Sequence, residues 1–212
     1  MKYQSKVSEA VIKRLPRYYR YLGDLVKMGI SRVSSKDLSA RMGITSSQVR
    51  QDFFCFGGFG LQGYGYDVEY LHSEIGKILG LENTFNMAII GVGHIGQALA
   101  NFPTFEKKGF KLVGLFDVNP ALVGQKIRDI EIQNFDSITE FAKHTPIDIA
   151  IICVPGMYAR EVANTVIDIG VKGIWNFAPI EFHGPDDVIV ENIHLSDSLM
   201  VLGYKINEFE KL

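Results

Sequence analysis

Apolar residues recur at helical spacing through the front third of the chain and form short continuous runs behind it. Ser8 is a candidate N-cap for a first helix that ends near Leu15, and Pro16 suits the first turn of a second helix. Apolar side chains three and four residues apart predict one buried face for this second helix, which reaches about Met28. Gly29 is expected to end it, because glycine readily adopts the left-handed conformation found after helices.

Two further helices are predicted on either side of a glycine. Ser34 or Ser35 can cap a short helix, and Gly43 allows a sharp turn out of it. Thr45 and Gln48 have the spacing of a capping box, which predicts the start of the next helix. A helix, a glycine turn and a capped helix together make the layout of a helix-turn-helix.

A segment rich in glycine and aromatic residues, Phe56 to Tyr66, suits a tight β-hairpin of the kind that forms a wing beside such a helix pair. Asp67 is a candidate cap for a connecting helix from Val68 to Leu79, which Gly80 is expected to end. We therefore expect a domain boundary at about residues 81–84.

Strands and helices alternate in the rest of the chain. Apolar runs predict buried parallel strands at 86–90, 111–117, 147–154 and 173–177, with helices at 94–101 and 159–169 and a last amphipathic helix at 194–209. Such alternation predicts an α/β fold with a doubly wound parallel sheet. The expected domains are a winged helix-turn-helix domain at 1–80, a Rossmann-type domain at 84–192 and a C-terminal helix at 193–212.

The run from Gly91 to Gly96 has the GxGxxG spacing of a dinucleotide-binding turn, between an apolar strand and a helix. Gly91 permits the tight turn, Gly93 lets phosphates approach the backbone, and Gly96 lets the helix lie close to the strand. Asp117 ends the second strand, where a carboxylate binds the adenine ribose and repels a 2′-phosphate, which favours NAD(H) over NADP(H). The alternative is a sheet that binds another nucleotide or nothing, with Asp117 as a helix cap.

The remaining residues near this turn are poor in groups for hydride chemistry. A dehydrogenase needs an acid, a base or a metal at the nicotinamide, yet His94, His144 and His183 have turn, surface and loop positions. The chain also has no Tyr-x-x-x-Lys pair and no zinc-ligand spacing. We therefore expect a binding pocket without catalysis or a metal ion. Its further expected contacts are Val92, His94, Ile95, Val118, Cys153, Val154, Pro155, Asn176, Phe177, Ala178 and Pro179.

Composition places the chain among ordinary globular proteins, with 47% hydrophobic and 22% charged residues. No apolar run approaches the ~20 residues that span a bilayer, and the first residues lack the apolar core of a signal peptide. Cys55 and Cys153 have no metal-ligand spacing and are interpreted as free thiols. We therefore expect a cytoplasmic protein.

Charge is distributed unevenly. Residues 1–56 hold eleven Lys and Arg against four Asp and Glu, a net charge of +7, whereas the remainder carries −9. A basic head on an acidic body is expected when one part meets a polyanion. A chance cluster on solvated helix faces would give the same count, so the charge indicates DNA only together with the helix-turn-helix.

A basic winged helix-turn-helix, a NAD-type Rossmann domain and a terminal amphipathic helix, in this order, resemble the Rex family of redox-sensing transcriptional repressors. The resemblance covers nearly the whole chain. It depends on Arg14-Leu15-Pro16 with Tyr18 to Tyr21, Val33 to Leu38, Gln48-Val49-Arg50 with Asp52, Phe56 to Asp67, the glycine turn, Phe116-Asp117 and Asn176 to Pro179.

The resemblance implies a homodimer that binds AT-rich palindromic operator DNA. It also implies that NADH promotes release from DNA while NAD⁺ competes with it. The terminal helix is implied to exchange between subunits and to lie beside the nicotinamide site of the other subunit. Leu195 of the partner subunit is then a candidate wall of that site, with Phe177, Ala178 and Pro179.

Candidate DNA contacts lie on or near the second helix of the pair. Arginine and glutamine can bond base edges, while serine hydroxyls suit phosphates and basic side chains neutralise them. The candidates are Ser46, Ser47, Gln48, Arg50 and Gln51, then Arg14, Arg17 and Lys36 as phosphate contacts, and Phe59 and Gly60 in the wing.

The chain departs from the commoner pattern of this family in places. Gln51 stands where many members have lysine, and Leu61-Gln62 stand where basic residues are usual. Phe102 and His194 replace a tyrosine and an aspartate, so an intersubunit hydrogen bond proposed for such members cannot form. Two other functions remain open from the residues: an oxidoreductase with an added helical domain, and a regulator that binds CoA or another nucleotide.

Overall fold

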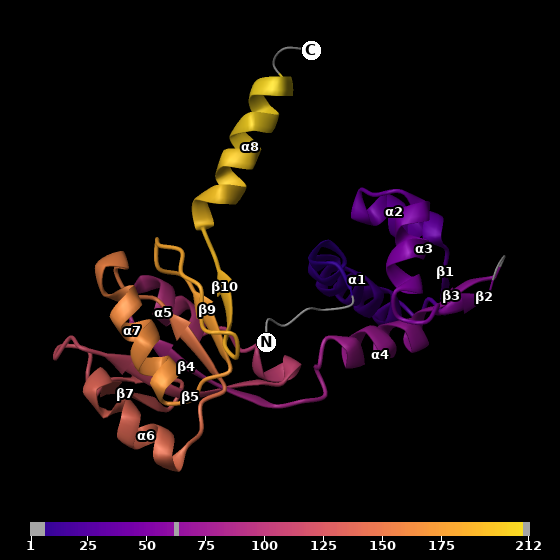
Figure 1. Cartoon of the computed structure of the whole chain (residues 1–212). Coiled ribbons are helices and arrows are strands. Elements are labelled where there is room, and N and C mark those ends of the chain that lie inside the picture. Colours follow the sequence, from indigo (N-terminus) through magenta and orange to yellow (C-terminus); the bar gives the residue numbers. More distant parts are fainter. Residues whose placement is uncertain (1–6, 62–63, 210–212) are drawn as a thin grey trace. The chain divides into compact units, whose positions relative to one another are not determined.

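The computed structural model describes residues 7–61 and 64–209 (Figure 1). The chain divides into two compact units, with the boundary between Asn83 and Thr84. We call them the helical unit and the sheet unit and describe each by itself. In the described residues, no helix combines the length and the apolar character needed to cross a membrane.

In the part of the helical unit that the structure describes, the chain forms four helices and a small antiparallel sheet with the strand order β1-β3-β2. Its elements are α1 (Glu9–Lys27), β1 (Arg32–Val33), α2 (Ser35–Met42), α3 (Ser46–Phe54), β2 (Gly60–Leu61), β3 (Gly65–Asp67) and α4 (Val68–Ile78). The predicted hairpin is therefore present as β2 and β3, although Gln62 of the wing lies outside the described residues. This is the expected winged helix-turn-helix layout.

Helix α1 is continuous, so the break predicted at Pro16 is wrong. Pro16 lies exposed inside the helix, while Val11, Leu15 and Tyr18 continue one buried face on both sides of it. The proline removes one backbone donor, but packing of this face holds the two halves in line. Ser8 occupies the N-cap position without a side-chain cap bond.

The predicted caps of α2 and α3 differ in completeness. Ser34 and Asp37 form a full capping box at α2, with each side chain accepting from the backbone of the other. At α3, Thr45 Oγ1 accepts from Gln48 N at 3.1 Å, as predicted. The Gln48 side chain makes a different bond, to Asp52, so the second half of the predicted box is missing.

The described residues of the sheet unit form seven strands and four α-helices. Its strands are β4 (Phe85–Ile90), β5 (Phe110–Asp117), β6 (Lys126–Ile127), β7 (Ile130–Asn134), β8 (Ile149–Ile152), β9 (Gly173–Asn176) and β10 (Ile189–Asn192). Its helices are α5 (His94–Ala100), α6 (Ile138–His144), α7 (Gly156–Asp168) and α8 (Leu195–Phe209). The sequence did not predict β6, β7 or β10, and β8 is shorter than the predicted strand.

The strand order is β10-β9-β8-β4-β5-β7-β6, and all neighbours are parallel except β6 and β7. From β4 the chain first builds outward through β5 and β7, then returns to the other side through β8, β9 and β10. This is the Rossmann arrangement, whose strand order reverses between β4 and β8. Ligands of such sheets bind beyond the carboxyl ends of the strands at that reversal.

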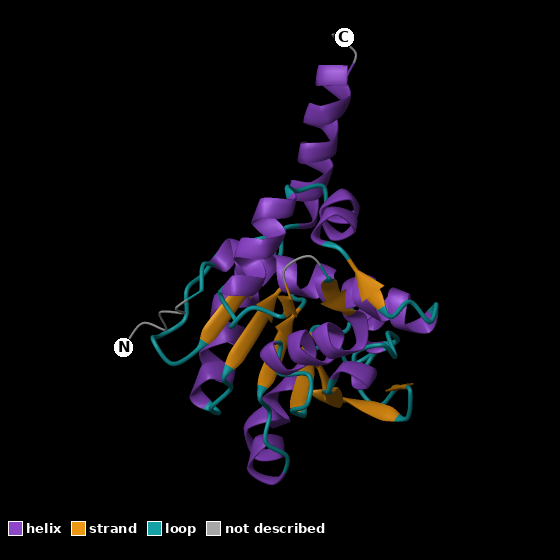
Figure 2. Ribbon diagram, turned by 90° about the vertical axis from the view of Figure 1, so that its right-hand side faces the viewer, coloured by secondary structure: helices purple, strands orange, loops and turns teal. Residues whose placement is uncertain are grey.

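Helices cover both faces of the sheet (Figure 2). In β4, Ala88 and Ile90 pack in one hydrophobic cluster with side chains of α6 and α7. Met87 and Ile89, on the opposite face, pack in a second cluster with Ala100 of α5. Burial of both faces explains why this strand is a continuous apolar run.

Helix α8 follows β10 and matches the predicted C-terminal helix. It has no buried residue, although apolar side chains such as Leu199, Leu202 and Phe209 lie along it. Exposed apolar surfaces of this kind are typical of interaction sites.

His72 of α4 stacks on Tyr19 of α1, with the ring centroids 4.2 Å apart. Burial lowers the pKa of His72, so the unfolded chain binds this proton more readily than the folded chain. The stability linked to His72 is therefore present above its unfolded pKa of about 6.5 and is lost as pH falls through the folded pKa.

We expect the free energy of unfolding, measured with urea and far-ultraviolet circular dichroism, to be lower at about pH 5.5 than at about pH 7.5. The difference should shrink in His72→Gln, because glutamine does not titrate. His183→Gln, at an exposed position, is the matched control and should keep the wild-type difference. An unaltered pH difference in His72→Gln would contradict this assignment.

Candidate functional site

Two glycines of the turn after β4 are required by contacts inside the chain. Gly91 has a φ of 90°, and a Cβ there would lie 2.7 Å from the Cys153 carbonyl oxygen. A Cβ on Gly96 would overlap the Gly91 carbonyl oxygen. These contacts bring the start of α5 against the ends of β4 and β8, as the GxGxxG spacing predicts.

Gly93 differs from the other two glycines. Its φ is −74°, which any residue adopts, and a Cβ there would meet no atom of the chain within 4 Å. Neither backbone strain nor packing therefore requires glycine here. The remaining physical reason for a missing side chain is the close approach of another molecule to the backbone.

Gly93 borders a cavity of about 780 Å³ beyond the ends of β4, β5 and β8. The predicted residues that line it are Gly91, Gly93, Asp117, Val118, Cys153, Val154 and Pro155. Leu122, Phe135, Thr139, Tyr158 and Glu161 also line it and were missed, because they come from loops and helices without a sequence pattern. The cavity lies at the reversal of strand order, where this fold binds ligands.

The other predicted cofactor contacts lie outside the lining of this cavity. Val92 is buried in the turn, while His94 and Ile95 are exposed at the start of α5. Phe177, Ala178 and Pro179 follow β9, and Leu195 begins α8. None of these side chains lines the cavity.

Asp117 stabilises the glycine turn by hydrogen bonds to the backbone. Its Oδ2 accepts from Val92 N at 2.7 Å, and its Oδ1 accepts from Asn119 N at 2.8 Å. No helix begins after Asp117 in the structure, so the carboxylate caps a turn and not a helix. Each carboxylate oxygen has a second lone pair that can accept from a ligand hydroxyl.

Asn176 supports the loop after β9 from within. Its Oδ1 accepts from Ala178 N at 3.0 Å, and its Nδ2 donates to Ile180 O at 2.7 Å and to Asn192 Oδ1 at 2.9 Å. Asn192 Nδ2 in turn donates to Phe182 O at 3.1 Å. The Asn176 side chain was predicted to contact a cofactor, but its amide is engaged inside the chain and fixes the loop to β10.

The thiol that lines the cavity is weakly reactive. Burial raises the pKa of the Cys153 thiol to about 12, so it stays protonated near neutral pH and is a poor nucleophile. His94 and His183 are exposed. Within the described residues, no group of three or more His, Cys, Asp or Glu side chains could hold a metal ion. The arrangement is suited to binding.

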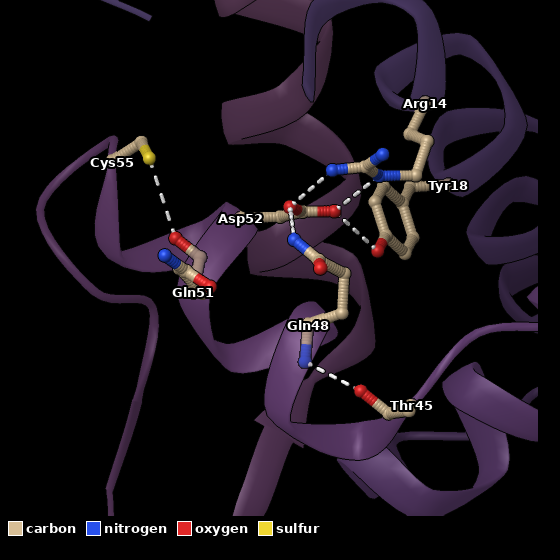
Figure 3. A network of polar contacts seen from close by, with 7 residues as sticks. All are labelled: Arg14, Tyr18, Thr45, Gln48, Gln51, Asp52 and Cys55. Atoms are coloured by element: carbon tan, nitrogen blue, oxygen red, sulfur yellow. Dashed lines mark hydrogen bonds and ion pairs between the residues drawn. The ribbon is translucent and has the colours of Figure 1, made fainter. Parts of the chain in front are cut away.

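In the helical unit, three side chains converge on Asp52 of α3 (Figure 3). Arg14 donates from Nε to Oδ2 and from Nη2 to Oδ1, both at 2.7 Å. Tyr18 donates its hydroxyl to Oδ2 at 2.9 Å, and Gln48 donates from Nε2 to Oδ1 at 3.0 Å. We call these four residues the Asp52 network.

Asp52 stays ionised inside the helical unit although its exposed fraction is 0%. Burial disfavours the charged form and is the largest single influence on its pKa. The hydrogen bonds from Arg14, Gln48 and Tyr18 together outweigh burial and hold the pKa of Asp52 below its ordinary value. Burial and the bond to Asp52 raise the pKa of Tyr18, so the phenol remains a donor.

The predicted DNA contacts separate into two sets. Ser47, Arg50 and Gln51 on α3 and Lys36 on α2 are exposed. Arg17 is exposed too, with one bond to Met42 O, and Ser46 Oγ bonds Ser39 Oγ at 3.0 Å. Gly60 lies in β2.

Three predicted DNA contacts are used inside the helical unit. Arg14 and Gln48 bond the buried Asp52, so their polar groups do not point freely to solvent. Phe59 is half-buried, with its ring against Phe53 at 6.0 Å between centroids. These three side chains make internal contacts in the structure, and their DNA contacts stay predictions.

Two family models match the chain. Residues 6–53 match a putative DNA-binding protein N-terminus, and residues 82–180 match a CoA binding domain. The redox-sensing transcriptional repressor Rex of Caldicellulosiruptor saccharolyticus is 57% identical over 205 residues, which cover 97% of this chain and 94% of the relative. Rex of Clostridium novyi is 54% identical over 209 residues, with 99% and 100% covered. The chain belongs to the Rex family.

Solved structures agree with this membership. The Rex-family repressor RSP in complex with beta-NAD⁺ and operator DNA has a TM-score of 0.91 and 53% identity, covering 98% of this chain and 95% of RSP. RSP with beta-NADH has a TM-score of 0.91 and 50% identity, covering 98% and 97%. The predicted resemblance is confirmed, and so is the expectation of a non-enzymatic protein, because Rex proteins are transcriptional repressors.

We expect Asn176→Ala to lower the free energy of unfolding of the sheet unit by about 2–4 kcal/mol, because it leaves buried donors and acceptors without partners. The only tryptophan, Trp175, precedes Asn176 in β9 with its ring against Phe177, and it reports unfolding by fluorescence. Asn101→Ala is the matched control, since the Asn101 amide makes one exposed bond to Gln97 O. Equal losses in the two variants would contradict a supporting role for Asn176.

Proposed function

We propose that this chain is a homodimeric, NADH-responsive repressor of transcription. In this account it binds NAD(H) in the cavity beside Gly93, binds palindromic operator DNA through α3, and leaves the DNA when NADH binds. The proposal rests on the open space beside Gly93 at the reversal of strand order, in a chain that also has a helix-turn-helix. Such a repressor would act in the cytoplasm.

The described residues fit a dinucleotide. The pyrophosphate would lie at Gly93 and the start of α5, where backbone N–H groups lack partners in a preceding turn. Asp117 would accept from the adenine ribose hydroxyls with its remaining lone pairs while it keeps the turn in shape. The nicotinamide end would reach the loop from Phe177 to Pro179, which Asn176 holds in place.

The exposed side of α3 suits operator DNA. Arg50 and Gln51 can reach base edges, and Ser47, Lys36 and Arg17 can bond phosphates. Two such helices in a dimer must lie about one duplex turn apart, ~34–36 Å, to enter successive major grooves. The net charge of +7 over residues 1–56 supports this surface, because phosphate neutralisation supplies much of the affinity.

Helix α8 is the proposed dimer element. Its exposed apolar side chains need cover, and exchange between two chains would place Leu195 of the partner subunit beside the nicotinamide loop. NADH and NAD⁺ differ in ring charge, so a low-dielectric wall at this loop would discriminate between them. NADH would then weaken DNA binding to the extent that it binds more tightly to a dimer geometry in which the two recognition helices are wrongly spaced for DNA.

One other ligand has an observation in its favour. The family model that matches residues 82–180 describes a CoA binding domain, so CoA is the second candidate. Calorimetric titrations with NADH, NADPH and CoA separate the two candidates. We expect NADH to bind more tightly than the other two, because Asp117 suits a free ribose and repels a 2′-phosphate.

The test of function is a fluorescence anisotropy titration of the chain with the operator duplex of the related repressor RSP. We expect NADH to raise the Kd for this duplex at least about 10-fold, which is a typical size for coupling between two sites. NAD⁺ should leave this Kd nearly unchanged. If the two nucleotides act alike, or neither changes the Kd, the sensor proposal fails.

Two glycine variants test the cofactor site. Gly93→Ala should keep the wild-type free energy of unfolding, because its Cβ meets nothing in the chain, yet raise the Kd for NADH at least about 10-fold through steric contact with the ligand. Gly96→Ala, the matched control, should lose about 1–3 kcal/mol of stability from overpacking. Wild-type NADH affinity in Gly93→Ala would contradict the proposed placement of the phosphates.

A further inference from the structure

The proposed recognition helix α3 contains one acidic residue, Asp52. An exposed carboxylate beside DNA would repel phosphates, but this one is fully buried on the face that also buries Val49 and Phe53. Four hydrogen bonds from three side chains occupy its two oxygens. The negative charge is thereby removed from the surface of the helix.

The donors to Asp52 come from two helices. Arg14 and Tyr18 lie on α1, one turn apart, and Gln48 lies one turn before Asp52 on α3. A forked guanidinium contact defines a direction as well as a distance, because both of its bonds must stay nearly in one plane. The Asp52 network therefore fixes the rotation of α3 about its own axis relative to α1.

That rotation decides where the exposed side chains of α3 point. At 3.6 residues per turn, Arg50 lies about 200° around the helix from Asp52. A small rotation of α3 about its axis would shift Arg50 and Ser47 sideways in the major groove of bound DNA, while most apolar contacts of the core would be kept. Such a displacement matters for base contacts, which need correct geometry, more than for phosphate contacts, which are largely electrostatic.

Stability alone gives a weak reason for this arrangement. A buried ion pair replaced by apolar side chains of similar volume is often no less stable. The same pair, if broken by removal of one partner, leaves an uncompensated charge. The bonds of Asp52 thus supply orientation more than net stability.

We infer that Asp52 is a positioning residue for DNA recognition, which acts through Arg14 and Gln48 to hold α3 at one rotation and to keep those two side chains off the DNA. The inference rests on the proposed function. It makes Gln48 a support of the helix and leaves Arg50 and Gln51 as the candidate base readers. Arg14 is then held away from DNA by its ion pair with Asp52, and it becomes available to a phosphate only when Asp52 loses its charge.

The first variant, Asp52→Asn, removes the charge and keeps the shape of the side chain. We expect the ratio of operator affinity to scrambled-duplex affinity to fall at least about 10-fold. Arg14, now free, should add one phosphate contact, so affinity for the scrambled duplex should rise and its logarithmic salt slope should steepen by about one unit. A merely structural residue would not steepen this slope. NADH affinity should stay unchanged.

A second variant keeps the test valid if the first folds poorly. Arg14→Met with Asp52→Leu replaces the pair by apolar side chains and should keep the wild-type urea midpoint. We expect it to lose the operator preference as well, without the steeper salt slope, because no cation is released. The matched control is Asp24→Asn on α1, which also removes one negative charge from the helical unit and should keep the operator preference.

The outcomes are distinct. If the wild-type chain binds the operator no better than the scrambled duplex, the proposed function fails and the inference fails with it. If the wild type prefers the operator and both Asp52 variants keep this preference within about twofold of Asp24→Asn, the inference alone is overturned. Loss of discrimination at a single base pair in Gln48→Ala would also overturn it, because Gln48 would then read a base.

Discussion

The close approach between the Gly91 carbonyl and Gly96 is the contact on which the cofactor site depends. It presses the start of α5 against the ends of β4 and β8 and leaves no room for a side chain at either glycine. Asp117 holds the same turn from β5 through the Val92 N–H. The cavity and the open backbone at Gly93 follow from this packing, which places them where the strand order reverses.

Buried polar groups position the other recognition elements. Asn176 fixes the loop after β9 and bonds Asn192 of β10, three residues before α8 begins. Asp52 likewise connects α3 to α1. In both places a buried polar side chain bonds partners in defined directions. Burying it costs little free energy, because every bond is made. Each unit therefore holds a recognition element in place through a fully bonded buried polar group.

The sequence predicted the parts whose causes are local. The glycine spacing, the caps at Ser34 and Thr45 and the apolar run of β4 depend on near neighbours, and the structure contains each of them. The break at Pro16 was wrong because packing of a long apolar face overrides the missing donor. The strands β6, β7 and β10 were missed, because they are short and carry polar residues, so they lack a continuous apolar run.

The ion pair of Arg14 could not be predicted for another reason. Arg14 meets Asp52 across 38 positions of the chain, and no local pattern reveals such a pair. A basic side chain near a recognition helix therefore resembles a phosphate contact in the sequence, whether it faces DNA or a buried carboxylate. The exposed apolar face of α8 was predicted, yet its cover depends on a second chain and stays a proposal.

Thermodynamic reciprocity gives a direct test of NADH-dependent release from DNA. If NADH weakens operator binding, operator DNA must weaken NADH binding by the same factor, because the two effects are one coupling free energy. The measurement is the Kd for NADH, from its fluorescence, with and without saturating operator duplex. We expect the operator to raise the Kd for NADH by the same factor by which NADH raises the Kd for the operator. An NADH affinity that the operator leaves unchanged would contradict NADH-dependent release.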